Sequence, residues 1–571
     1  MDWYPLWNSL RIALISCAAV FFLGIFAAYY IARLPRVIKG VLDVLLTLPM
    51  VLPPTVVGYF LLLLFGAKRP LGIFFMQHFG VKLVMNWYSA IFASIVVAFP
   101  LMYRTARGAF ESFDETLAWS AQTLGQSDTW IFWRVRMPAC RQGILAGTVL
   151  AFARALGEYG ATSMIAGYTP GKTATIATTV YQLWRTNDEL GAMRGCWGYR
   201  HFGGGAAGGE PAGEKTESGC PEMSLEINIE KKLDGFTLRA AFTAGNTSTA
   251  LLGASGCGKS MTLRCIAGIV KPDRGRIVLD GRVLFDSDRH IDLPPQQRGV
   301  GLLFQNYALF PNMTVEQNIL CGLKTEKDPA ARRAACAEML RTMRLEELAK
   351  RYPAQLSGGQ QQRAALARIL VGKPRILMLD EPFSALDSYL REEVEGEVGS
   401  LLANFAGTAL LVTHNRDEAY RLCKEMIVLN EGQVLRTGST KAVFADPQSI
   451  AAARLTGCKN ILPCTPLDSH TVRLDGWNTT LRLALPVPAG CTAVGIRAHD
   501  FTRCAADAPN AIPVKAVSTS ENPFDWTLIC TPPEGTAQLW WKVSKKSLCS
   551  AAPAAPQHLC AAPESIMPLK D

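Results

Sequence analysis

The run Gly-Ala-Ser-Gly-Cys-Gly-Lys-Ser at 253–260 is the part of this chain whose residue types and spacing point most directly to chemistry. Glycines let backbone N–H groups close around phosphate, and a helix that starts after such a loop adds positive potential. In this pattern Lys259 reaches the β- and γ-phosphates and Ser260 binds Mg²⁺. We therefore predict an ATP and Mg²⁺ site made by Gly253, Ala254, Ser255, Gly256, Cys257, Gly258, Lys259 and Ser260.

Two carboxylates at a strand end form a second group with catalytic chemistry. The apolar run Ile376–Leu379 ends in Asp380 and Glu381. In nucleotide hydrolysis, one such carboxylate holds the Mg²⁺ shell and the other polarises the attacking water. A strand followed by Asp-Glu-Pro is also compatible with an ordinary turn. Beside a phosphate loop the catalytic interpretation is favoured, with Asp380 at the metal and Glu381 as the catalytic residue.

These residues need a framework that places the strand ends together. Residues 223–445 alternate strand-like and helix-like runs, which is typical of a parallel sheet covered by helices. Thr249–Leu252 is predicted to be the strand before the phosphate loop, and Met261–Ile266 begins the helix after it. A phosphate loop requires this context. The sequence therefore predicts an α/β P-loop ATPase domain over residues 223–450.

The run Leu356-Ser357-Gly358-Gly359-Gln360 resembles the signature motif of the ABC family of ATPases. In that family the signature lies at a helix N-terminus and caps the ATP held by the other subunit of a dimer. The resemblance implies that Ser357, Gly358, Gly359 and Gln360 contact nucleotide. It also implies a homodimer through the ATPase domains, with two composite sites.

The same resemblance assigns roles to further positions. Gln305 fits the residue that senses the metal, the γ-phosphate and the attacking water. His414 fits the γ-phosphate switch histidine, although a lone histidine is more often structural. Phe236 is the candidate for the aromatic ring that stacks on adenine, and Ser384–Asp387 fits the loop that contacts the second subunit.

Composition limits the other function classes. The 571-residue chain has a net charge of +10, which can indicate nucleic-acid binding. Its Lys and Arg are scattered and several flank apolar runs, as the positive-inside rule expects, so we expect no nucleic-acid partner. The 16 cysteines contain no Cys-x-x-Cys. We expect reduced, mostly buried thiols rather than a disulfide or metal framework.

Residues 1–193 are membrane-like, and four apolar segments are long enough to span a bilayer, at about 9–31, 41–66, 88–103 and 143–167. The first is too long for a cleavable signal peptide and is expected to remain as an anchor. The basic loop 33–39 and the arginine-rich stretch 104–142 should face the cytoplasm, which places the N-terminus outside. Lys68-Arg69 on the outer side argues against this orientation. We predict an all-α, multi-pass domain in contact with lipid in the cell membrane, with the ATPase in the cytoplasm.

The loop after the third predicted span carries Trp119-Ser120-Ala121, Gly125 and Val135-x-Met137-Pro138. It resembles the coupling loop of ABC importer permeases, which has Glu-Ala-Ala, three residues, Gly, nine residues and then an apolar-x-apolar-Pro ending. Gly125 and Pro138 keep that spacing, whereas the leading triplet departs from it. The resemblance implies that 114–138 passes motion from the ATPase to the spans. An ordinary amphipathic loop is the alternative.

Two opposite charges occur in the fourth apolar segment. Arg154 and Glu158 are four residues apart, on one helix face. Charges at membrane depth usually face a pathway or each other, so a substrate pathway and a self-neutralising pair both remain open. The stretch Phe152–Thr162 and the later Pro170-Gly171-Lys172-Thr173 resemble the permease subunit of molybdate/tungstate importers, and next the sulfate permeases. The resemblance covers most of residues 5–190.

Residues 194–222 continue neither half. Four spans that start outside also end outside, so a fifth crossing is required before the ATPase. Residues 172–190 are too polar to provide it, and 195–222 is a Gly-rich run predicted to be a linker. We interpret 194–222 as an out-of-frame or relic joint between two adjacent genes. A true fusion with a reversed or re-entrant topology is the alternative.

Residues 451–571 contain short β-like runs separated by turns. They resemble the small β-barrel appended to the ATPases of oxyanion and sugar importers, with 457–461 as its opening. Oxyanion binding and a ligand-free role in stabilising the dimer both remain open. The Ala/Pro-rich residues 551–563 are predicted to be a loose tail.

The three regions together predict ATP-driven import of a small oxyanion, molybdate or tungstate, across the cytoplasmic membrane. A separate extracytoplasmic oxyanion-binding protein should deliver the solute. A sulfate importer, a soluble ABC ATPase and a transport-inactive, frameshifted fusion are the alternatives. The apolar residues 5–167 argue against the soluble ATPase.

Overall fold

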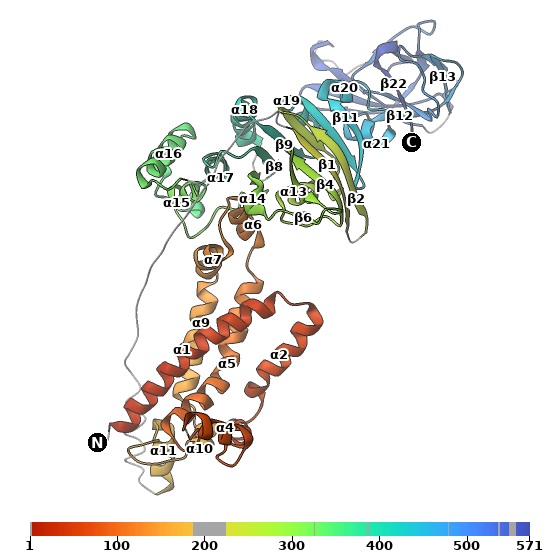
Figure 1. The fold of residues 1–571 in the computed structure, drawn as a ribbon. Coiled ribbons are helices and arrows are strands. Elements are labelled where there is room, and N and C mark those ends of the chain that lie inside the picture. Colours follow the sequence, from red (N-terminus) through yellow and green to blue (C-terminus); the bar gives the residue numbers. More distant parts are fainter. Residues whose placement is uncertain are drawn as a thin grey trace. The chain divides into compact units, whose positions relative to one another are not determined.

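The structure is a computed structural model that describes residues 3–80, 82–186, 224–233, 235–324, 326–384, 388–477, 479–534, 537–547 and 555–571. The predicted junction at 194–222 and residues 385–387 of the predicted dimer-contact loop lie outside the described residues. The chain divides into two compact units (Figure 1). One consists of Met1–Glu115 with Thr129–Ala212, and the other of Thr116–Asp128 with Gly213–Asp571.

The first unit is helical throughout its described residues. Its principal helices are α1 (Tyr4–Ala32), α2 (Arg36–Val51), α3 (Pro54–Phe65), α4 (Pro70–Phe79), α5 (Trp87–Glu111), α9 (Arg141–Leu156), α10 (Gly160–Ile165) and α11 (Ile176–Arg185). The segment before α9 holds α7 (Asp128–Ile131), the π-helical turn η1 (Phe132–Arg136) and α8 (Met137–Ala139). Helices α1, α5 and α9 pack together, and small side chains at their contacts allow close approach. Those fully buried alanines are Ala13, Ala28, Ala98, Ala106 and Ala151.

The second predicted span, 41–66, is not one straight helix. Helices α2 and α3 meet at a 110° bend. Within the described residues, only α1 and α5 are each long and apolar enough to cross a membrane as a single helix. The α2–α3 pair makes a third crossing if the two helices count as one span. The break falls at Pro53-Pro54. Proline lacks the N–H that a continuous helix needs and keeps the preceding residue out of the helical region.

The fourth predicted span, 143–167, is also interrupted. Helix α9 ends at Leu156, and α10 begins at Gly160 after a short break. The Glu158 carboxylate accepts a hydrogen bond from the backbone N–H of Ala161 at 2.9 Å. The first N–H groups of a helix have no partner within the helix, and a carboxylate that accepts from one of them stabilises the helix start. The contact therefore favours the start of α10 over a continuation of α9. The following α11 has 10 residues, about 15 Å, so it is too short for the missing fifth crossing.

The second unit contains the predicted α/β domain. Its eleven-stranded sheet has the order β6-β5-β4-β1-β2-β11-β10-β3-β9-β8-β7. The strands are β1 (Leu225–Lys232), β2 (Thr237–Ala244), β3 (Ser248–Leu252), β4 (Arg274–Leu279), β5 (Arg282–Asp286), β6 (Ile291–Asp292), β7 (Val300–Leu303), β8 (Ile376–Asp380), β9 (Thr408–Thr413), β10 (Glu425–Asn430) and β11 (Gln433–Ser439).

The described helices of the second unit are α6 (Glu115–Thr123), α13 (Lys259–Ala267), α14 (Pro295–Arg298), α15 (Val315–Leu320), α16 (Pro329–Thr342), α17 (Gly358–Leu370), α18 (Ser388–Asn404), α19 (Arg416–Leu422), α20 (Thr440–Ala445) and α21 (Ile450–Leu455), with the 3₁₀ turns η2 (Glu346–Leu348) and η3 (Pro353–Gln355). Helices α13, α18 and α19 lie beside this sheet, and α15, α16 and α17 form a group to one side of it (Figure 1). In β8, Leu377 and Leu379 face one core cluster, and Ile376 and Met378 face another. Burial on both faces is typical of parallel strands covered by helices, so the α/β prediction is confirmed.

Residues beyond this sheet form three small antiparallel sheets, ordered β14-β13-β12-β15-β22, β16-β21-β17 and β18-β19-β20. The strands are β12 (Asn460–Pro466), β13 (Thr471–Leu474), β14 (Thr479–Arg482), β15 (Ala493–Ile496), β16 (Phe501–Arg503), β17 (Ala511–Pro513), β18 (Lys515–Glu521), β19 (Asp525–Thr531), β20 (Leu539–Ser544), β21 (His558–Ala561) and β22 (Ile566–Leu569), with 3₁₀ turns η4 (Lys545–Ser547) and η5 (Pro563–Ser565). One core that includes Trp477 and Trp541 joins these sheets. The predicted strands are present, and their closure into a barrel stays a prediction. Helix α21 contacts β10, β11 and β15, so it spans the predicted boundary at 450–451.

The predicted loose tail at 551–563 is wrong for the described part of that segment. Strand β21 lies between β16 and β17, and its Leu559 is fully buried. The prolines at 556 and 563 flank this strand rather than interrupt it. Proline marks where a strand ends as readily as where a loop continues, so composition alone misplaced the segment. The 13 cysteines among the described residues are all free thiols, and ten of them are buried.

Candidate nucleotide-binding site

The parallel strands bring the predicted site residues to one edge of the sheet. Strands β3, β9, β8 and β7 are neighbours, in a register that pairs Leu252 with Thr413 and Leu303 with Leu379. The phosphate loop, His414, Glu381 and Gln305 each follow the carboxyl end of one of these strands. Ligands of open α/β sheets bind at that edge.

Glycines give the phosphate loop its shape. Gly256 and Gly258 have φ of +82° and +106°, which side chains rarely allow. A Cβ on Gly253 would lie 2.3 Å from the Leu429 carbonyl oxygen. Cys257 is buried in the loop, and burial raises the pKa of its thiol. The loop leads directly into α13, whose first-turn N–H groups are available to an anion.

Lys259 places a cation inside this loop. Its side chain is buried, and Nζ donates to the carbonyl oxygens of Gly253 and Ala254, both at 2.8 Å. A buried ammonium needs such acceptors to offset the loss of water. The arrangement fixes one positive charge beside the start of α13, where the phosphates of a nucleotide would also meet the N–H groups of the loop.

Ser260 and Asp380 form the candidate metal site. The Ser260 hydroxyl donates to Oδ1 of Asp380 at 2.8 Å. Burial raises the pKa of Asp380, and the hydrogen bond from Ser260 opposes that shift. A hydroxyl and a carboxylate suit Mg²⁺, which usually takes one or two carboxylates and completes its shell with water and substrate phosphates. The described residues contain no cluster of three or more His, Cys, Asp or Glu side chains that could hold a metal.

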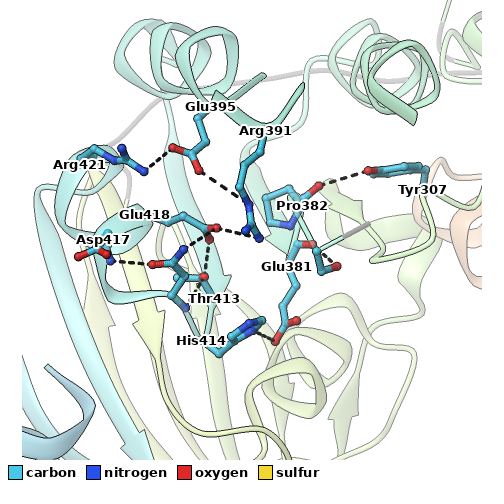
Figure 2. A network of polar contacts seen from close by, with 12 residues as sticks. Tyr307, Glu381, Pro382, Arg391, Glu395, Thr413, His414, Asp417, Glu418 and Arg421 are labelled. Carbon is cyan, nitrogen blue, oxygen red and sulfur yellow. Dashed lines mark hydrogen bonds and ion pairs between the residues drawn. The ribbon is translucent and has the colours of Figure 1, made fainter. Parts of the chain in front are cut away.

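Glu381 and His414 face each other across the ends of β8 and β9 (Figure 2). Nδ1 of His414 lies 3.1 Å from Oε1 of Glu381. The backbone N–H of Glu381 donates to the Val412 carbonyl at 3.0 Å, and Glu381 has a positive φ of 44°. Non-glycine residues held in this region are strained and cluster at functional sites. The carboxylate therefore has a fixed position at the predicted site for the attacking water.

Gln305 is exposed just beyond β7, and a buried arginine fixes the turn that follows it. Tyr307 and Ala308 have φ of 60° and 44°. From α17, Arg368 donates to their carbonyl oxygens at 3.0 and 2.8 Å, and also to Oδ1 of Asn318 at 3.3 Å. Burial lowers the pKa of Arg368 to about 10. Sequence reasoning missed this residue because an arginine in a helical run carries no signal of its buried acceptors.

The signature motif forms the start of α17. Ser357 and Gln360 make a reciprocal capping box, in which the Ser357 N–H donates to Oε1 of Gln360 at 3.0 Å. Gly358 and Gly359 occupy the first turn. Their N–H groups have no partner within the helix, as at any helix start. The contact of this motif with nucleotide on a second subunit stays a prediction.

Phe236 lies against the phosphate loop. Its ring is 3.6 Å from the position that a Cβ on Gly258 would take, and it also packs against Gly432. An aromatic face beside the loop is compatible with stacking on adenine, and that role stays a prediction.

The predicted coupling loop lies partly in the second unit. The Trp119 ring, on α6, lies 6.5 Å from the Phe304 ring and 5.2 Å from the Arg264 guanidinium. Nε2 of Gln126 donates to the Cys321 carbonyl at 2.8 Å. Gly125 lies two residues after the end of α6 and has φ of +81°. Pro138 lies within the short α8 that precedes α9.

Arg154 and Glu158 pair with each other in the first unit, with Nη2 of Arg154 3.4 Å from Oε2 of Glu158. The Arg154 side chain is 40% exposed and that of Glu158 is 1% exposed. The self-neutralising pair is therefore present, with the Arg154 side chain partly exposed and the Glu158 side chain buried. A role in a substrate pathway stays a prediction.

The phosphate loop, the Ser260–Asp380 contact and the strand-end carboxylate define an ATPase domain of the P-loop class. The comparisons agree: residues 240–384 match the family model described as ABC transporter. Residues 21–188 match the model described as binding-protein-dependent transport system inner membrane component. The chain thus joins a permease-type segment to an ABC-type segment that binds ATP with Mg²⁺. It is a multi-pass membrane protein whose ATPase domain lies in the cytoplasm.

Curated relatives carry names of polyamine transport. The spermidine/putrescine import ATP-binding protein PotA of Oleidesulfovibrio alaskensis is 44% identical over 246 residues, which is 42% of this chain and 63% of that protein. The putrescine transport ATP-binding protein PotG of Escherichia coli is 44% identical over 213 residues, 37% of this chain and 55% of that protein. The chain thus spans 55–63% of the length of these two relatives.

Among solved structures, an ATP-binding cassette in a dimeric, post-hydrolysis state with ADP and Pi is 29% identical. The match covers 38% of this chain and 99% of that one, with a TM-score of 0.33.

Proposed function

We propose that this protein is an ATP-driven importer in which one chain supplies both the permease and the ATPase. The observation that carries the proposal is the convergence of Lys259, Ser260, Asp380, Glu381 and His414 at one sheet edge, in a chain that also contains membrane-spanning helices. Glu381 polarises the attacking water, and Ser260 and Asp380 hold Mg²⁺.

We propose that the solute is a small oxyanion of the molybdate class. On the predicted outer side of the membrane half, Lys and Arg outnumber the carboxylates Asp2, Asp188 and Glu189, and the sequence contains no carboxylate between Asp43 and Glu111. Glu158, the acidic residue of the fourth segment, is neutralised by Arg154. Cations attract anions and repel polyamines along an entry route. The cations in question are Arg11, Lys68, Arg69, Lys82, Lys172 and Arg185.

A polyamine importer is the second candidate. The names of the PotA and PotG relatives favour it, and those proteins are ATP-binding subunits by name. Such subunits energise transport without necessarily contacting the solute. We therefore give the charge of the permease-type half more weight than these names when choosing the solute.

The proposed partners follow from the same chemistry. Two ATPase domains would form a dimer, with Ser357–Gln360 of each capping the nucleotide of the other. A separate extracytoplasmic binding protein would deliver the oxyanion to the helices. The β-rich region after residue 457 would serve as an accessory domain of the dimer or as an oxyanion sensor.

Uptake into proteoliposomes tests this function. The full chain would be reconstituted with ATP on the side of the ATPase and with a periplasmic extract supplying the binding protein. We expect ATP-dependent uptake of radiolabelled molybdate that excess tungstate competes away and that Glu381→Gln abolishes. Uptake of radiolabelled putrescine instead would replace the oxyanion by a polyamine. ATP hydrolysis without uptake of molybdate, sulfate or putrescine would support the transport-inactive fusion.

A further inference from the structure

The position of His414 depends on the backbone around it. Its side chain is 49% exposed and contacts Glu381 at its tip. It lies between the last residue of β9, Thr413, and Asn415, which caps α19. Because the imidazole of His414 is half exposed, few side-chain contacts fix its position. The backbone conformation at Thr413 and Asn415 therefore determines whether the imidazole reaches Glu381.

One buried carboxylate binds both neighbours of His414. The Thr413 hydroxyl donates to Oε2 of Glu418 at 2.5 Å, and Nδ2 of Asn415 donates to Oε1 at 3.2 Å. The Asn415 N–H in turn donates to the Thr413 hydroxyl at 2.9 Å. Glu418 is 3% exposed. Its two oxygens thus fix the loop on both sides of the histidine, as Figure 2 shows.

A cation from a different helix holds this carboxylate. Nη2 of Arg391, on α18, lies 3.4 Å from Oε1 of Glu418. Nε of Arg391 lies 4.0 Å from Oε1 of Glu395, and Oε2 of Glu395 accepts from Arg421 on α19 at 2.6 Å. A buried carboxylate without a partner is costly, so the contact with Arg391 stabilises Glu418 in this position. Helices α18 and α19 are thereby tied together beside the nucleotide site (Figure 2).

We propose that Glu418, held by Arg391, is a positioning residue that sets the imidazole of His414 against Glu381 during ATP hydrolysis. The inference rests on the proposed function, because it presupposes that His414 contributes to turnover. Both Asn415 and Arg391 contact Oε1 of Glu418, whereas the Thr413 hydroxyl contacts Oε2. Methionine in place of Glu418 removes both acceptor oxygens. Glutamine keeps an acceptor at the Oε1 position, and its NH₂ can donate to the Thr413 hydroxyl, so it is the conservative variant.

Steady-state kinetics of the purified full chain test the proposal. We expect Glu418→Met to lower kcat by roughly 10- to 100-fold while the affinity for the fluorescent analogue TNP-ATP changes by less than about threefold, because the loss is confined to turnover. The conservative Glu418→Gln should retain most of the turnover. Arg391→Met leaves Glu418 in the chain and should produce a smaller loss than Glu418→Met. Glu346→Met is the matched control, since this carboxylate pairs with Arg341 on an exposed surface, and it should keep wild-type turnover.

A double-mutant cycle separates positioning from fold support. If Glu418 acts through His414, His414→Ala combined with Glu418→Met should turn over no more slowly than His414→Ala alone. Losses that multiply, or a Glu418→Met defect that appears equally in nucleotide affinity and melting temperature, would overturn the inference and leave the proposed function standing. Wild-type turnover in His414→Ala would remove His414 from the mechanism and overturn the inference, while the proposed function would still stand on ATP-dependent uptake.

Discussion

Ser260 and Asp380 are 120 positions apart in the chain, yet the hydroxyl of one donates directly to the carboxylate of the other at 2.8 Å. The two groups come from the first turn of α13 and the last residue of β8. Their contact places the two oxygens that we propose to bind Mg²⁺ beside each other. The fold of the sheet therefore places the site residues together. Single substitutions at these residues should change the rate of ATP hydrolysis and the stability of the fold to different extents.

Asp380→Asn should abolish Mg²⁺-dependent hydrolysis while stabilising the nucleotide-free protein. Burial raises the pKa of Asp380 in the folded state. An acid whose folded pKa lies above its unfolded value costs stability at every pH above the unfolded value, and that cost shrinks as pH falls through the folded pKa. At pH 8 we expect the variant to melt roughly 2–4 °C higher than wild type, with a smaller difference toward pH 5.

Thermal melts in EDTA across that pH range measure this difference. Asp273→Asn is the control of opposite sign, because the hydrogen bond from Lys231 lowers the pKa of Asp273. This exposed pair should contribute little, so its loss should lower stability slightly or not measurably. A lower melting temperature for Asp380→Asn at pH 8 would show that the carboxylate supports the fold.

Glu381→Gln should stop turnover while preserving ATP binding. The amide keeps the size of the side chain but cannot take up a proton from water, and general bases typically contribute 10²–10⁴-fold to rate. We expect kcat to fall by about 10³-fold, with nucleotide affinity unchanged, in phosphate-release and nucleotide-binding assays. Wild-type turnover in this variant would remove Glu381 from its proposed role.

Arg368→Met should destabilise the protein and slow hydrolysis together. Arg368 is fully buried, and its removal leaves the carbonyls of Tyr307 and Ala308 without their donor. Each buried acceptor that loses its donor costs about 1–3 kcal/mol, so we expect a total loss of about 2–4 kcal/mol after relaxation. Thermal unfolding and ATPase assays check this, and Arg368→Lys should recover part of both losses. An unchanged melting temperature for Arg368→Met would contradict the proposal that Arg368 stabilises the turn at Tyr307 and Ala308.

Trp119→Ala should separate ATP hydrolysis from uptake. The Trp119 ring packs against Phe304 and the Arg264 side chain. Phe304 directly precedes Gln305 in the chain. Removing the ring leaves the phosphate loop and the strand-end residues intact, so ATP hydrolysis should persist. Uptake should fall by about tenfold, which corresponds to a loss of about 1.4 kcal/mol in the coupling free energy between the ATPase and the permease-type helices. Parallel ATPase and uptake measurements on the same proteoliposomes test this. Equal losses in both would place Trp119 in the fold or the ATPase chemistry instead.

The sequence by itself determined the nucleotide chemistry of this protein. The phosphate loop, the Asp380–Glu381 strand end and the signature run are local patterns, because each needs neighbouring residues to supply both the turn and the chemical group. The apolar segments likewise identified a membrane half, since bilayer thickness sets a length that can be counted along the chain.

Only the tertiary structure decided where the membrane helices are interrupted and which polar contacts support the nucleotide site. Pro53-Pro54 marks a break in the sequence, but the 110° angle between the two helices came from the structure. The break after α9 depends on the contact of the Glu158 carboxylate with the Ala161 N–H. The carbonyl acceptors of Arg368 and the donors to Glu418 are long-range or loop contacts that no spacing encodes. Local chemistry can be read from sequence because the reacting groups are specified one by one, whereas the polar side chains that support them are specified by three-dimensional packing.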